Sequence, residues 1–75
     1  MTPEERQKQL ADMQCWVFRM AQQKWHKSPS ACADLFEQHR LLKFMDECYE
    51  ILHQSGYAHV VCELEQVLQH DGVTL

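Results

Sequence analysis

Glycine and proline are scarce in this sequence, with only two of each among 75 residues. No run of apolar residues approaches the roughly 20 that a membrane-spanning helix needs. There is also no glycine-rich turn that would present backbone amides to a phosphate or an oxyanion. These absences disfavour a membrane span and a loop-built active site, so we do not expect an enzyme.

Positive charge is also in short supply. The chain has seven Lys and Arg against eleven Asp and Glu, which gives a formal net charge of −4 with the five histidines neutral. The basic residues are scattered along the sequence rather than gathered into a run. Nucleic-acid affinity rests on clustered basic side chains that displace counterions from phosphates. We therefore expect no nucleic acid among the partners.

The four cysteines, Cys15, Cys32, Cys48 and Cys62, include no closely spaced pair. An even number would allow two disulfides in three connectivities. The polar N-terminal segment, however, lacks the apolar stretch of a secretion signal. Each cysteine lies on or beside an apolar helical position, where a thiol behaves as a small hydrophobe. We expect reduced core cysteines in a cytoplasmic protein.

A metal site is a weaker alternative. His59, Cys62 and Glu63 would lie on neighbouring positions of one helix face. Zinc usually takes four ligands, and its cysteine ligands commonly come in close pairs such as C-x-x-C. We therefore expect no metal and no cofactor, and keep a small metal-binding protein only as an alternative.

Helix starts and stops are well marked. Thr2 and Ser28 each precede a proline, which is the pattern of an N-cap followed by the first helical residue. Gly56 and Gly72 follow two apolar stripes and suit helix ends. The sequence predicts a single all-α domain over residues 1–75, a compact bundle of about four helices at about 3–25, 29–39, 41–54 and 57–70. The break before residue 41 has no glycine or proline.

The first helix has more apolar surface than three short helices would cover. Tryptophan and methionine are also favoured at protein interfaces. We expect Trp16 to pack in the core, and Trp25, at the helix end, to stay partly exposed. The candidate partner-binding residues of this helix are Met13, Trp16, Val17, Phe18, Met20 and Trp25.

A helix-turn-helix regulator that binds DNA through residues 28–54 is a second alternative. The segment from Ser28 to Phe36 is similar to the first helix of such a motif. The following helix would then read the DNA, but its polar face carries one base, Lys43, and three acids. That charge is of the wrong sign for a groove lined by phosphates.

One pattern in the sequence goes beyond helical periodicity. Its residues are Ser28, Leu35, Phe36, Tyr49, Leu52 and His53, followed by Val60, Val61 and Leu64. The pattern resembles a family of small bacterial proteins of unknown function over about residues 14–70. The resemblance implies an all-helical fold and a bacterial, cytoplasmic origin, with no catalytic residues assigned. Genes of such proteins often stand beside a gene for an ADP-ribosyltransferase-like toxin, which implies an antitoxin or accessory role. The chain departs from the family in its high cysteine content and in having residues 38–40 where a glycine-containing break is more usual.

Tyr49 and His53 are one helical turn apart, so their side chains are expected to lie adjacent. We expect His53 to cap its helix and hold it against the last one. Taken together, the sequence predicts a non-enzymatic module that presents part of its first helix, with an acidic rim, to another protein or to a second copy of itself. If that partner is a toxin, the acidic charge would mask a basic surface.

Overall fold

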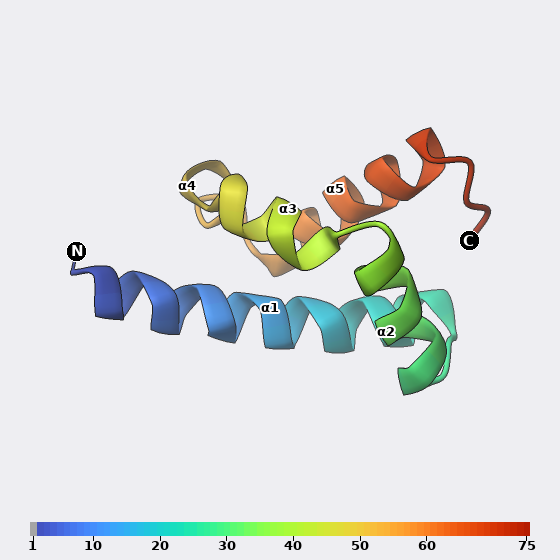
Figure 1. Cartoon of the computed structure of the whole chain (residues 1–75), viewed down its shortest axis with the longest axis horizontal. Coiled ribbons are helices and arrows are strands. Elements are labelled where there is room, and N and C mark those ends of the chain that lie inside the picture. The colour runs from blue at the N-terminus through green and yellow to red at the C-terminus, as the bar shows by residue number, and fades with distance from the viewer. Residues whose placement is uncertain (1) are drawn as a thin grey trace.

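The computed structural model describes residues 2–75. In that range every regular element is an α-helix, and there is no strand. The helices are α1 (Pro3–Trp25), α2 (Pro29–Gln38), α3 (Leu41–Glu47), α4 (Tyr49–Leu52) and α5 (Tyr57–His70). As Figure 1 shows, α1 runs along the length of the molecule, α3, α4 and α5 lie on one side of it, and α2 closes one end. The molecule measures 37 × 22 × 20 Å. The predicted all-α bundle is confirmed.

Both predicted N-caps form. The Thr2 hydroxyl accepts a hydrogen bond from the backbone N–H of Glu5 at 3.2 Å, and Ser28 accepts one from Ala31 at 3.2 Å. Each bond satisfies one of the backbone donors that a helix leaves unpaired at its start. The two serine/threonine–proline pairs therefore set where α1 and α2 begin.

The segment predicted as one helix over residues 41–54 is in fact divided. Cys48, at φ −101° and ψ 13°, separates α3 from α4. Upstream, Arg40 turns the chain between α2 and α3 in the left-handed conformation, with φ at 53°. A non-glycine residue rarely adopts that conformation, so the turn could not be predicted from the residues at this position. His26 ends α1 in the same way, with φ at 54°.

The core is built around one face of α1. Its buried residues Met13, Val17, Ala21 and Trp25 are four apart, so they align on a single face of the helix. Phe18, at the edge of that face, packs against Phe36 of α2 edge-to-face, with ring centroids 5.0 Å apart. The other helices contribute the remaining buried side chains, which are Cys32, Phe36, Leu41, Met45, Tyr49, Leu52, Val60, Val61, Leu64 and Leu68.

Polar contacts hold α1 at both ends. Near its start, Arg6 pairs with Asp46 and Glu50 at 3.2 Å each, and its guanidinium lies 5.0 Å from the centre of the Tyr49 ring. Those two carboxylates raise the pKa of Arg6 by hydrogen bonding. Tyr49 also donates its hydroxyl to Gln9 of α1 at 2.8 Å. These contacts attach the first turns of α1 to α3 and α4.

A further contact ties the end of α2 to the end of α5. His39 Nδ1 lies 2.8 Å from a carboxylate oxygen of Asp71. Within residues 2–75, no helix combines the length and the apolar character required to cross a bilayer.

Candidate functional site

Half of the candidate binding residues on α1 are core residues. Met13, Val17 and Trp25 are 1%, 0% and 8% exposed. They lie on the face of α1 that the other helices cover, so they cannot contact a partner in this fold. The prediction that they line a binding face is therefore wrong for these three residues, and so is the expectation that Trp25 stays partly exposed.

The other three candidates reach the surface. Trp16 is 53% exposed, and Phe18 and Met20 are partly buried against the core. Trp16 was expected in the core, but it lies one residue before Val17, about 100° round the helix from it. Trp25 takes the buried position because its indole N–H finds an acceptor, Glu65, at 2.8 Å.

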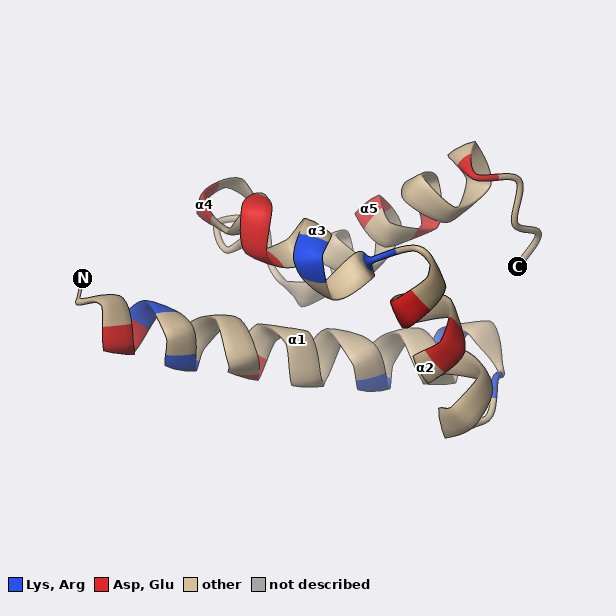
Figure 2. Cartoon of the chain, in the orientation of Figure 1, with Lys and Arg blue, Asp and Glu red and all other residues tan. Residues whose placement is uncertain are grey.

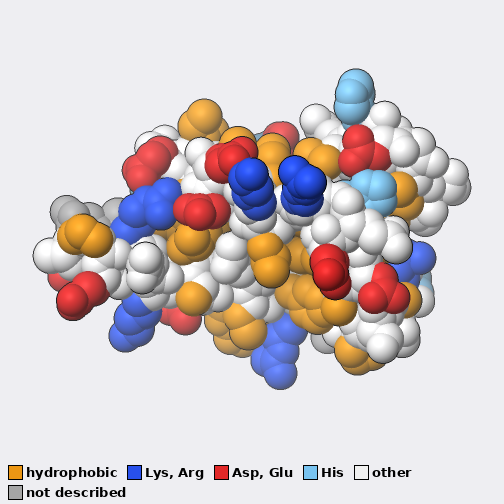
Figure 3. All heavy atoms as spheres, viewed as in Figure 1, with side chains coloured by type: hydrophobic (Ala, Val, Ile, Leu, Met, Phe, Trp, Pro, Cys, Tyr) orange, Lys and Arg blue, Asp and Glu red, His pale blue; other side chains and the backbone are white. Residues whose placement is uncertain are grey.

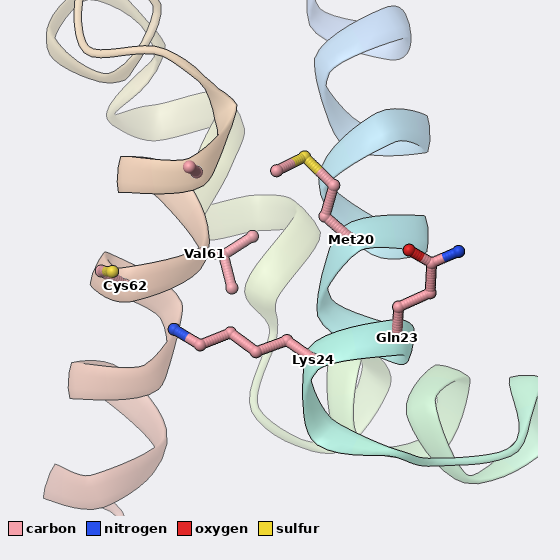
Figure 4. Close-up of a pocket in the computed structure, with 6 residues that line it drawn as sticks. Met20, Gln23, Lys24, Val61 and Cys62 are labelled. Carbon is pink, nitrogen blue, oxygen red and sulfur yellow. The ribbon is translucent and has the colours of Figure 1, made fainter.

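The first of two surfaces beside α1 is the α1–α5 groove, a hollow of about 550 Å³. In Figure 4, Met20 and Lys24 project from α1 toward α5, and Val61 projects from α5 toward α1. Lys24 donates to Glu65 of α5 at 3.0 Å, and this bond raises the pKa of the lysine. The groove is lined by Met20, Gln23, Lys24, Ala58, Val61 and Cys62.

The second is the α1–α2–α3 surface, made of two adjoining hollows of about 450 and 380 Å³. Phe18 and Leu42 line both, so the hollows adjoin at these two side chains. Leu42 is 46% exposed. Figure 3 shows apolar side chains gathered at the centre of this face, with Lys and Arg side chains beside them. The remaining lining residues are Gln14, Cys15, Arg19, Gln22, Ala33, Phe36, Glu37, Arg40 and Lys43.

Charge around the α1–α2–α3 surface is mainly positive. Its lining includes Arg19, Arg40 and Lys43 but only one acid, Glu37. Figure 2 places basic positions on α3 and on the segment just before it, between acidic positions on α2 and at the end of α3. This local balance is opposite in sign to the chain's net charge of −4.

All four cysteines are free thiols, but they are not all in the core. Cys32 is buried and Cys48 partly so, whereas Cys15 and Cys62 are exposed. The expectation of a core position is therefore wrong for Cys15 and Cys62, which lie on the flanks of the apolar stripes of α1 and α5. Burial raises the pKa of Cys32 because the thiolate would lose its hydration.

The histidine, cysteine and acidic side chains of residues 2–75 form no cluster of three or more that would hold a metal ion. His59 Nε2 instead lies 3.1 Å from a carboxylate oxygen of Glu63, one turn later on α5. That pair occupies two of the three positions on which the metal alternative depended.

The residues of the sequence pattern hold the fold together. Ser28 caps α2, while Phe36, Tyr49 and Leu52 are buried. Leu35 packs against the core, partly buried. His53 stacks on the Tyr49 ring, with centroids 5.0 Å apart, as its spacing predicted. The backbone N–H of His53 donates to the Tyr49 carbonyl and closes the last turn of α4.

Leu42 and Arg40 were not among the predicted site residues. Leu41 and Leu42 are adjacent, so only one of them can face the core of a helix. Leu41 is buried with Met45, four residues later, which leaves Leu42 at the surface. That spacing was readable in the sequence. The place of Arg40 was not, because it depends on a left-handed turn that no glycine marks.

A family model described as "Protein of unknown function (DUF3791)" matches residues 12–71. This range contains the whole sequence pattern and both surfaces beside α1. No curated protein and no solved structure matches the chain.

Proposed function

Because this chain belongs to the family of proteins of unknown function DUF3791, we propose a function from its surface: it is a non-enzymatic module that binds another protein through the exposed side of α1. Trp16 is the observation that carries the proposal. Its side chain is 53% exposed and lines a hollow together with Arg19 and Met20, which lie one turn further along α1. Tryptophan is among the residues that contribute most to binding energy at interfaces.

The rest of the exposed side of α1 supports the same function. Met20 opens into the α1–α5 groove, and Phe18 into the α1–α2–α3 surface. A partner seated over Trp16 would reach an apolar hollow on either side of it. Contiguous apolar patches on the surface of a soluble domain often mark interaction sites.

The finer proposal is an antitoxin or accessory protein in the bacterial cytoplasm, whose partner is a toxin-like enzyme. It rests on the resemblance described above. A second copy of the chain remains the other candidate occupant of α1.

Neither alternative class gains support. A DNA-reading helix would have to be α3, which is only seven residues long. Asp46 of α3 and Glu50 of α4 pair with Arg6, and the charged residues of α3 are one base, Lys43, and two acids, Asp46 and Glu47. A phosphate-lined groove would repel that helix.

Co-purification from the native host tests the proposal. The tagged chain is compared with Trp16→Ser and with a matched control, Ile51→Ser, because Ile51 is also exposed, at 73%, but lies on α4. We expect the partner to be retained by the wild type and by Ile51→Ser and lost from Trp16→Ser. A chain that is recovered alone and elutes as a monomer by light scattering would count against the proposal, and so would equal retention by both variants.

A further inference from the structure

The chemistry of the partner can be taken one step further, on the basis of the proposed function. We infer that the α1–α2–α3 surface binds an amphipathic helix of the partner whose apolar face is flanked by Asp and Glu. Three observations carry this inference: the shape of the surface, the charge around it, and the conformation of Arg40.

The shape suits a helix that presents apolar side chains one turn apart. The two hollows adjoin each other across Phe18 and Leu42, so the surface is longer than a single pocket. Apolar side chains at positions i and i+4 of a helix lie next to each other on one face. A helix that inserts one such side chain into each hollow would use the mode by which amphipathic helices bind apolar grooves.

The charge around the α1–α2–α3 surface indicates which residues should flank the apolar face of the partner's helix. Two basic side chains elsewhere on the chain are neutralised internally, Arg6 by Asp46 and Glu50, and Lys24 by Glu65. Around this surface, by contrast, Arg19 and Arg40 form no ion pair among residues 2–75, and Lys43 has only a loose contact to Glu47 at 3.8 Å. Carboxylates on the partner would complement these three cations and improve specificity and association rate.

Arg40 adds a backbone argument. It holds φ at 53°, a left-handed conformation that is sterically unfavourable for an L-residue other than glycine. Glycine would make the same turn without that cost. The arginine side chain at this position lines the hollow that also contains Phe36 and Leu42. A binding role gives a physical reason for a charged side chain at a position that the fold alone would assign to glycine.

The α1–α5 groove does not offer the same charge. Its only basic residue, Lys24, already donates to Glu65. A nucleic acid is also a poorer occupant of the α1–α2–α3 surface than a helix, because its bases would need exposed aromatic faces to stack on. The aromatic rings that line this surface, Phe18 and Phe36, pack against each other. The exposed ring of Trp16 lies beside the surface, with the Arg19 guanidinium 5.8 Å from its centre.

A peptide selection tests the inference on the full chain. A displayed library of helical peptides with randomised surface positions is selected on the wild type and depleted on Leu42→Asp. We expect the enriched peptides to carry apolar residues at i and i+4 with Asp or Glu beside them. The most enriched peptide, labelled with fluorescein, then serves as the probe in anisotropy titrations at low and high salt.

Variants at the rim separate charge from folding. Lys43→Glu should weaken binding of the probe by at least about tenfold at low salt. Lys8→Glu makes the same change in net charge near the start of α1, outside both hollows. It should change the affinity for the probe by less than about threefold. Circular dichroism verifies that each variant, including Leu42→Asp, remains helical; if Leu42→Asp unfolds, Leu42→Ala replaces it in the depletion step.

Several results would overturn the inference. They are enrichment of basic peptides, equal weakening by Lys43→Glu and Lys8→Glu, and displacement of the probe by a single-stranded oligonucleotide. Self-association that Leu42→Asp abolishes would assign the surface to a second copy instead. If depletion on Leu42→Asp removes every peptide that the wild type had enriched, and the removed peptides bind Met20→Asp poorly, this inference is overturned and the proposed function stands. A lone monomer from the native host counts instead against the proposed function itself.

Discussion

Trp25 donates its indole N–H to Glu65 at 2.8 Å and so joins the last turn of α1 to the middle of α5. Lys24 donates to the other carboxylate oxygen at 3.0 Å. Burial of Glu65 raises the pKa of its carboxyl group, but these two hydrogen bonds and the lysine charge outweigh that effect. The pKa of Glu65 therefore lies below its usual value.

This lowered pKa predicts a loss of stability in acid. A carboxyl group with a lower pKa in the folded state stabilises the fold above its unfolded pKa, which is about 4.3. That contribution disappears as the pH falls through the folded pKa. We expect Glu65→Gln to lower the free energy of unfolding at pH 7 and to reduce its decline between about pH 5 and pH 3. Urea titrations followed by circular dichroism measure both, with Glu4→Gln as a control on an exposed site; a parallel decline in wild type and Glu65→Gln would contradict the prediction.

Tyr49 allows its ring and its hydroxyl to be separated. The side chain is 1% exposed, and its hydroxyl donates to Gln9. Tyr49→Phe removes one hydrogen bond and should cost up to about 1.5 kcal/mol of unfolding free energy. Tyr49→Ala also removes a buried ring under Arg6 and His53 and should cost about 3–5 kcal/mol. Similar losses from both substitutions, measured by denaturant unfolding, would show that the ring contributes little.

Arg40→Gly is expected to separate stability from binding. Glycine adopts the left-handed turn without steric cost, so the free energy of unfolding should rise by up to about 1 kcal/mol. Binding of the acidic peptide probe should weaken at the same time, because one of the three cations is lost. Arg40→Lys keeps the charge and should change neither the free energy of unfolding nor the binding of the probe. A stabilised Arg40→Gly that binds the probe as tightly as the wild type would remove Arg40 from the binding surface.

The thiols are expected to react in two classes. Cys15 and Cys62 are exposed, whereas Cys32 is buried and its raised pKa reduces the fraction of thiolate, the reactive form. Labelling of the native protein with a maleimide, followed by mass spectrometry of its peptides, should show rapid modification of Cys15 and Cys62 and slow modification of Cys32. Rapid labelling of Cys32 without denaturant would contradict the burial described here.

The helix starts and the buried face of α1 were predictable because they depend on local chemistry. A serine or threonine before a proline specifies a helix start, and apolar residues four apart specify a face. The exchange of roles between Trp16 and Trp25 was not predictable. It depends on Glu65, 40 residues beyond Trp25, which satisfies the buried indole. Likewise, the break between α3 and α4 at Cys48 comes from packing of Tyr49 and Leu52 into the core. No glycine or proline near Cys48 would have allowed its prediction.

The distribution of charge over the folded surface could not be predicted from the sequence either. The composition of the chain is acidic and, taken alone, favours a partner with a basic surface. Folding, however, uses Asp46, Glu50 and Glu65 to neutralise Arg6 and Lys24. The cations that remain beside Phe18 and Leu42 are Arg19, Arg40 and Lys43. They come from three separate helices or turns, so they form no basic cluster in the sequence.

The pairing of α1 with α5 also has a consequence for synthesis. The buried face of α1 is completed by Val60, Val61, Leu64 and Leu68 of α5, which leave the ribosome after α1 to α4. Until then the nascent α1 exposes apolar side chains that a chaperone or a protease would recognise. If the partner binds α1 during translation, it would meet this helix before the domain is closed, and assembly of the complex would begin on the ribosome.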